Sequence, residues 1–78
     1  MTITRNQTNR LRFCFDGDVG AAYTLHICGQ EIELQLESVC KNCYLFSFDL
    51  TCDERAGTYK YDLVKDGEIV KSGNLIIQ

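Results

Sequence analysis

The alternation of apolar and polar residues with a period of two is the feature that most constrains what this chain can fold into. It is clearest at the end of the sequence, in GTYKYDLVKDGEIVKSGNLIIQ. Asp66-Gly67 separates two alternating runs, Thr58–Lys65 and Glu68–Ile77, and Asp-Gly is a preferred pair for a type I′ turn. Because strand side chains alternate between two faces, this stretch predicts a β-hairpin with one buried face.

The same alternation predicts five more strands earlier in the chain, at Thr2–Arg5, Arg10–Asp16, Ala22–Cys28, Glu31–Glu37 and Cys43–Thr51. We expect Gly29-Gln30 to form a tight type II′ turn and Ser38–Asn42 to form a loop. The polar segment Cys52–Ala56 is expected to form a loop or a single helical turn. A glycine inside a strand often marks a bulge, which we expect at Ser72-Gly73.

These elements predict the fold class. Short strands at a spacing of roughly ten residues, with no long segment of helical period, are typical of a β-sandwich or a small barrel. We expect the sandwich, specifically an all-β, immunoglobulin-like antiparallel β-sandwich of about seven strands. With 78 residues the chain is near the lower size limit of an independent domain, so residues 1–78 are expected to form a single domain.

Charge and hydropathy exclude several partners. The net charge is -3, and the basic residues cluster only at Arg5, Arg10 and Arg12, whereas a nucleic-acid binder of this size carries a basic stripe. No apolar run approaches the roughly 20 residues of a membrane span. The opening MTITRNQTNR lacks the apolar segment of a signal peptide. We therefore expect no nucleic acid, no membrane, and a protein that stays in the cytoplasm unless it leaves inside a larger particle.

Five cysteines allow one metal-site hypothesis. Thiols in the cytoplasm stay reduced, and a reduced cysteine packs as a small apolar side chain. However, Cys40 and Cys43 form a CxxC pair, and Cys28 and Cys52 could complete a four-thiolate zinc site. Zinc ribbons usually contain two CxxC pairs and this chain contains one, so zinc is the minor alternative and no cofactor is expected.

Catalytic motifs are missing from the sequence. His26 is the only histidine, and it lies on the strand face opposite to Leu25 and Ile27, without an identifiable partner for general-base catalysis. Asp16-Gly17-Asp18 resembles the start of a calcium loop, but position twelve of that loop is Ile27 instead of glutamate. Phosphate-binding loops and the common hydrolase motifs are also absent. We expect a protein that is not an enzyme.

Three segments carry a resemblance to a known family. The opening ITRNQTNRLRFCF, the central YLFSFDL and the closing hairpin resemble the small β-sandwich domains of tailed-phage virion proteins. The similarity is to the N-terminal domain of phage baseplate upper proteins and to head-fibre proteins, including those of crAss-like phages. The distinctive matches are Gly57, Tyr59, Tyr61, Asp62, Gly67 and Gly73, with looser matches at Asn6 and Thr8. The five cysteines and the short middle region depart from the family pattern.

The resemblance implies a non-enzymatic virion structural protein. Such a protein is a decoration or adaptor module that docks on capsid, neck, tail or baseplate proteins. It is made in the host bacterial cytoplasm, assembles in many copies and is expected to form a homo-oligomer. By residue type and position, we expect partner contacts at Arg5, Tyr59 and Tyr61.

Two alternatives come from other classes of protein. One is an intracellular protein-binding module stabilised by zinc at the four cysteines named above. The other is a small anti-host factor that inhibits a bacterial enzyme through an acidic strand face. That face comprises Glu31, Glu33 and Glu37, although a row of this kind is usually only the solvated side of a strand.

Overall fold

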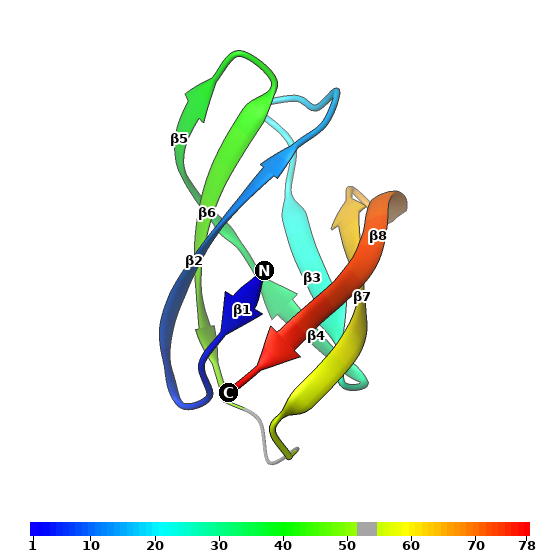
Figure 1. The fold of residues 1–78 in the computed structure, drawn as a ribbon. Coiled ribbons are helices and arrows are strands. Elements are labelled where there is room, and N and C mark those ends of the chain that lie inside the picture. The colour runs from blue at the N-terminus through cyan, green and yellow to red at the C-terminus, as the bar shows by residue number, and fades with distance from the viewer. Residues whose placement is uncertain (52–54) are drawn as a thin grey trace.

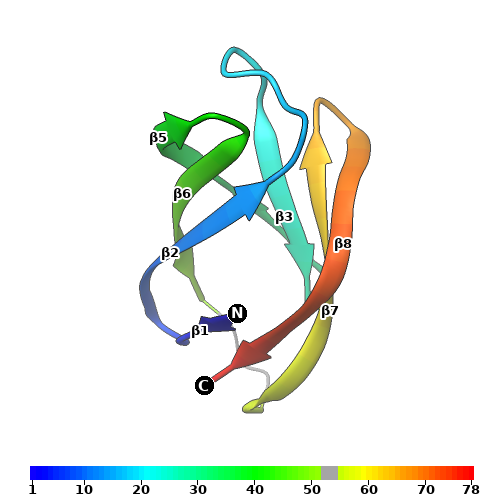
Figure 2. The same cartoon turned by 45° about the horizontal axis from the view of Figure 1, so that its top comes forward.

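The computed structural model describes residues 1–51 and 55–78, which form two packed β-sheets (Figure 1). In chain order, the described strands are β1 (Thr2–Ile3), β2 (Gln7–Cys14), β3 (Tyr23–Ile27), β4 (Gln30–Glu33), β5 (Gln35–Cys40), β6 (Cys43–Leu50), β7 (Gly57–Lys65) and β8 (Glu68–Ile77). Figure 2 shows the two layers, with β2, β5 and β6 on one side and β3, β7 and β8 on the other. The predicted all-β sandwich is confirmed, with eight described strands where about seven were expected.

The order of strands identifies the kind of sandwich. One sheet has the order β1-β8-β7-β3-β4, and the other has the order β2-β6-β5. Apart from β1, which runs parallel to β8, the described pairs are antiparallel. The arrangement of β8-β7-β3-β4 against β2-β6-β5 is that of strands G-F-C-C′ against B-E-D in immunoglobulin domains. The immunoglobulin-like expectation is therefore confirmed by the strand order of the two sheets.

The core lies between the sheets, where alternate residues of facing strands meet. Its largest fully buried side chains are Phe13, Phe46, Ile3, Leu25, Leu50, Leu63, Leu75 and Ile77. Phe46 lies at its centre, with ring centroids 6.2 Å from Phe13, 5.1 Å from Tyr23 and 6.2 Å from Tyr44. Tilted and offset aromatic contacts of this kind stabilise a core beyond the area that they bury.

Tyr59, near the start of β7, forms a tyrosine corner. Its hydroxyl donates a hydrogen bond to the carbonyl of Arg55, with an O···O distance of 2.7 Å. A tyrosine near the start of strand F that bonds back to the preceding backbone is a hallmark of immunoglobulin sandwiches. Two residues later, antibody domains have the second cysteine of the inter-sheet disulfide, and this chain has Tyr61. The ring centroid of Tyr61 is 5.6 Å from that of Phe13 in β2. An aromatic pair therefore joins the sheets at this position.

The corner gives a first prediction. We expect Tyr59→Phe to lower the free energy of unfolding by about 0.5–1.5 kcal/mol, because the variant loses one hydrogen bond and keeps the ring. Urea unfolding followed by tyrosine fluorescence measures the change. An unchanged midpoint and slope would show that the bond to Arg55 does not stabilise the domain.

The hairpin β7–β8 is confirmed, but its bulge lies elsewhere than predicted. Asp66 and Gly67 have φ of 48° and 88°, as a type I′ turn requires. The register changes from Leu63 opposite Lys71 to Val64 opposite Ile69, so the extra residue is Val70 and the expected bulge at Ser72-Gly73 is wrong. Gly73 lies opposite Tyr61, and a Cβ atom there would be 3.0 Å from ring carbon Cε1. The glycine makes room for the Tyr61 ring.

The turn after β3 also differs by one residue from the prediction. Cys28 and Gly29 are its central residues, with φ of 55° and 70°, and Gln30 already pairs with Ile27 as the first residue of β4. The expected Gly29-Gln30 turn is therefore wrong. Two successive positive φ angles characterise a type I′ turn, and the twist of such a turn matches the right-handed twist of the two strands that it joins.

The predicted strand Glu31–Glu37 is divided between the two sheets. At Leu34, whose backbone N–H donates to the carbonyl of Tyr23 at 3.0 Å, the chain leaves the sheet of β4 and enters the sheet of β5. The predicted loop Ser38–Asn42 is wrong, because β5 continues to Cys40. A bulge at Glu37 places Leu36 and Val39, which lie opposite the buried Phe46 and Tyr44, three positions apart, so the period of two is interrupted within this strand. In the predicted segment Cys52–Ala56, residues 52–54 lie outside the described residues.

Candidate functional site

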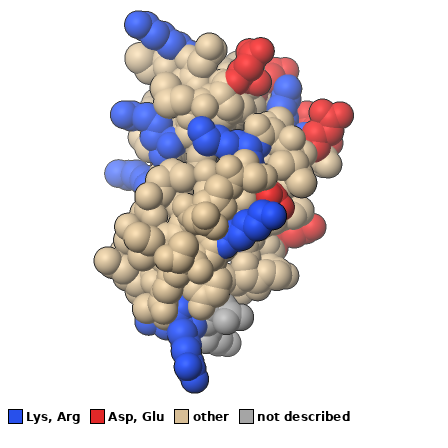
Figure 3. Space-filling view, turned by 45° about the vertical axis from the view of Figure 1, so that its right-hand side comes forward, with Lys and Arg blue, Asp and Glu red and all other residues tan. Residues whose placement is uncertain are grey.

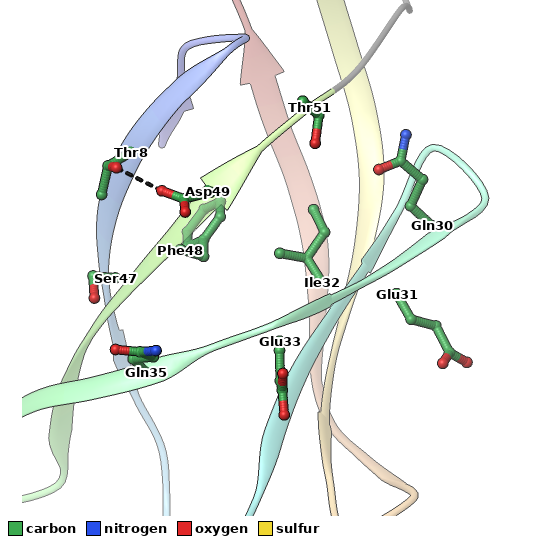
Figure 4. Close-up of a pocket in the computed structure, with 10 residues that line it drawn as sticks. All are labelled: Thr8, Gln30, Glu31, Ile32, Glu33, Gln35, Ser47, Phe48, Asp49 and Thr51. Atoms are coloured by element: carbon green, nitrogen blue, oxygen red, sulfur yellow. Dashed lines mark hydrogen bonds between the residues drawn. The ribbon is translucent and has the colours of Figure 1, made fainter.

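A groove of about 490 Å³ opens between β4 and the C-terminal half of β6 (Figure 4). The residues that line it are Thr8, Gln30, Glu31, Ile32, Glu33, Gln35, Ser47, Phe48, Asp49 and Thr51. It exists because β5 pairs with β6 only as far as Ser47, which lies opposite Gln35. Beyond Ser47, no described strand pairs with β6 on this side, and β4 is the outermost of the described strands in its own sheet.

The walls of the groove are two strand edges. Unpaired edges present backbone N–H and C=O groups that can bind another extended chain. At the base of the groove, Ile32 and Phe48 point toward its middle, and they are 9% and 4% exposed (Figure 4). The groove therefore combines an apolar base with hydrogen-bonding edges, as sites that accept a peptide strand do.

The charge of the groove is negative. Glu31, Glu33 and Asp49 line it, and no Lys or Arg occurs among the described residues that do so. The hydroxyl of Thr8 donates to Oδ1 of Asp49 at 2.5 Å, which holds that carboxylate in place on β6. On the side of β8, by contrast, basic side chains are spread over the surface and acidic ones lie along the right-hand border (Figure 3). The negative charge of the groove favours a partner that carries positive charge.

His26 lies between two carboxylates on the outer face of the larger sheet. It is opposite Glu31 of β4 on one side and Asp62 of β7 on the other. Its Nε2 is 3.6 Å from Oε1 of Glu31, a contact that becomes an ion pair only when the imidazole is protonated. Asp62 in turn accepts a hydrogen bond from Ser72 at 2.6 Å. This row of side chains is not evident in the sequence, because it depends on which strands are neighbours in the sheet.

The three residues predicted to contact a partner have structural roles within the chain. The backbone N–H and Nε of Arg5 both donate to the carbonyl of Gln78, at 3.1 and 3.2 Å. Tyr59 forms the tyrosine corner described above. Tyr61 is only 2% exposed and faces the core, so its prediction as a contact residue is corrected. Contacts of Arg5 and Tyr59 with a partner stay a prediction.

The cysteines are arranged differently from either prediction. Cys14 and Cys43 form a disulfide, because the register of β2 and β6 places them directly opposite each other, so the expectation that all thiols are reduced is wrong. Of the hypothetical zinc set, Cys43 is therefore already bonded. Cys28 belongs to the turn between β3 and β4, which lies at the opposite end of the sandwich from the turn between β5 and β6 that Cys40 and Cys43 flank (Figure 1). Cys52 is outside the described residues. Within residues 1–51 and 55–78, no cluster of His, Cys, Asp or Glu could hold a metal ion.

Two core tyrosines predict how stability changes with pH. Burial raises the pKa of Tyr61. Burial also raises the pKa of Tyr44, with further contributions from Tyr23, Asp18 and Asp16. A raised pKa means that the folded state favours the neutral phenol. The contribution of these two phenols to the free energy of unfolding is therefore complete below the pKa of about 10 that tyrosine has in the unfolded chain. It is lost as the pH rises through their higher pKa values in the folded state.

We accordingly expect the free energy of unfolding to be steady from neutral pH to about 9 with respect to these two groups, and to fall above about 10. Urea unfolding at a series of alkaline pH values measures the fall, and ultraviolet absorbance measures tyrosinate formation. The double variant Tyr44→Phe/Tyr61→Phe should show a shallower alkaline loss. An equally steep loss in that variant would contradict the assignment.

Together, the topology and the groove define an immunoglobulin-like β-sandwich with an acidic groove between two open strand edges. Comparisons with protein-family models, with curated proteins and with solved structures give no match. Across the described parts of the chain, no helix has the length and apolar character needed to cross a membrane.

Proposed function

We propose that this chain is a non-enzymatic virion structural protein, a decoration or adaptor module that docks on a capsid, neck, tail or baseplate protein. The resemblance of its opening, central and closing segments to small phage virion domains supports the virion context. The observation that carries the docking role is the groove between β4 and β6, whose walls are strand edges that pair with no other described strand. A small domain of this kind is stabilised further when a partner binds its folded state.

The mode of docking is strand addition. An extended segment of the partner lies in the groove, hydrogen-bonds to the edge of β4 or β6, and places an apolar side chain against Ile32 and Phe48. The carboxylates of Glu31, Glu33 and Asp49 favour a segment that carries Lys or Arg, because complementary charges speed association and select partners. The zinc-stabilised module is not proposed, since Cys43 is already bonded to Cys14 and the β3–β4 turn that holds Cys28 lies at the other end of the sandwich from the β5–β6 turn.

The test is mass spectrometry of purified virions from a phage that encodes this chain. We expect the chain in the particles in many copies. A chain that is absent from particles and monomeric in solution would overturn the proposal. If such a chain still bound a basic peptide, the groove would instead serve a host target, as the anti-host alternative requires.

Charge reversal separates docking through the groove from other modes of docking. Glu33→Lys changes an exposed residue of β4 inside the groove, and Glu68→Lys changes an exposed residue at the start of β8, away from it. Both variants are expected to fold. Only Glu33→Lys should lose incorporation into particles. Equal incorporation of the two variants would show that the groove is not the docking surface.

A further inference from the structure

Three cysteines lie in one row across the sheet of β2, β6 and β5. Cys14 is directly opposite Cys43, and Cys43 is directly opposite Cys40. Residues that face each other in antiparallel strands project from the same side of the sheet. Since Phe13 and Tyr44 project inward, all three sulfurs stand on the outer face. Cys14 and Cys40 are exposed and Cys43 is half-buried. We call these three residues the cysteine row.

Cys43 is within bonding reach of both neighbours. It is bonded to Cys14, with the two Cα atoms 3.9 Å apart. The backbone N–H of Phe15 donates to the carbonyl of Asn42 at 2.8 Å, and these two residues are adjacent in sequence to Cys14 and Cys43. A bond between the neighbours of a residue pair marks that pair, here Cys14 and Cys43, as a non-hydrogen-bonded pair. The backbone groups of Cys43 therefore face Cys40, in a hydrogen-bonded pair. Such pairs have Cα atoms about 5.5 Å apart, a separation common among disulfides.

We propose that the cysteine row is a thiol–disulfide exchange site. The thiolate of Cys40 attacks Sγ of Cys43, so that a bond forms between Cys40 and Cys43. The bond between Cys43 and Cys14 breaks, and its electron pair leaves on Sγ of Cys14. The proton lost by Cys40 passes through solvent to Cys14, and no oxidant or reductant is consumed. Because β6 lies between β2 and β5, Cys40 and Cys14 flank Cys43 from opposite sides, so the attacking thiol and the leaving thiol belong to different neighbouring strands.

The exchange moves a cross-link and a reactive thiol. In the first state the disulfide ties β2 to β6 across a sequence separation of 29 residues. In the second state it closes only the turn between β5 and β6, and β2 is no longer cross-linked. The exposed thiol then belongs to Cys14, beside the loop that precedes β3. The exchange therefore changes which strand end can form a mixed disulfide with another thiol compound.

Peptide mapping tests the site, because the sequence allows each cysteine of the row to be isolated. After free thiols are alkylated, cleavage with trypsin and with a protease that cuts after Glu and Asp releases Phe13–Asp16, Ser38–Lys41 and Asn42–Asp49. We expect wild-type protein incubated at pH 8.5 to contain two linked species. One joins Cys14 to Cys43 with Cys40 alkylated, and the other joins Cys40 to Cys43 with Cys14 alkylated. The second species should form more slowly at pH 5, because the thiolate is the nucleophile.

Three variants decide the result. Cys40→Ser should contain no alkylated Cys14, and Cys14→Ser should form the Cys40–Cys43 link when oxidised with glutathione disulfide. Cys28→Ser/Cys52→Ser should keep both linked species. The proposal would be overturned by a wild-type chain with only the Cys14–Cys43 link at every pH, by two free thiols in oxidised Cys14→Ser, or by loss of exchange in Cys28→Ser/Cys52→Ser.

Discussion

Phe46→Ala is expected to unfold this domain at room temperature or bring it close to unfolding. Phe46 is fully buried and contacts Phe13, Tyr23 and Tyr44, so the variant loses the transfer free energy of a phenyl ring and leaves a cavity at the centre of the aromatic core. Such substitutions cost about 3–5 kcal/mol, and small domains have only about 5–15 kcal/mol in total. Thermal unfolding followed by circular dichroism measures the change.

Val39→Ala is the matched control, because Val39 is also a strand residue but is 38% exposed. We expect its transition to stay close to that of the wild type. If Phe46→Ala unfolded at the same temperature as Val39→Ala, the two sheets could not be packed around Phe46 as described.

The second large effect is expected from Cys43→Ser, which removes the shared member of both possible disulfides. Closing a loop over a sequence separation of 29 residues is worth roughly 3–4 kcal/mol on the chain-entropy account of disulfide stability. We therefore expect the urea midpoint to fall markedly. Wild-type protein treated with a reducing agent should show a similar fall, because it loses the same cross-link.

Cys40→Ser is the control for this prediction, since it removes an exposed thiol and keeps the Cys14–Cys43 bond. At pH 5, where exchange within the cysteine row is slow, its midpoint should match that of the untreated wild type. A Cys43→Ser chain as stable as Cys40→Ser would show that the bond between β2 and β6 contributes nothing to folding.

The strands could largely be predicted because each is a local pattern. Leu11 and Phe13, or Leu63 and Leu75, are buried where the period of two places them. The errors occur where a feature of the neighbouring strand intervenes. The bulge at Glu37 changes the phase of β5, and the break at Leu34 sends the chain to the other sheet. Neither is visible in a period counted along a single strand.

The candidate site was less predictable, because it depends on where strands stop pairing. Glu31 and Glu33 were expected to lie on a solvated face, and they do project outward. These two residues line a groove because the pairing of β5 with β6 ends at Ser47, and no residue type in the sequence indicates where that pairing ends. The Cys14–Cys43 bond likewise depends on the register of β2 and β6.

The parallel pair of β1 and β8 determines how the domain responds to mechanical force. Thr2 and Ile3 lie beside Ile76 and Ile77, and the backbone bonds include Ile76 N–H to the carbonyl of Met1 at 3.0 Å and Gln78 N–H to that of Ile3 at 2.9 Å. Because the strands are parallel, tension applied between residues 1 and 78 shears these bonds along their strands. They therefore share the load and break together instead of opening one after another. A domain joined to its surroundings through these two residues would resist stretching up to a threshold force and then yield abruptly.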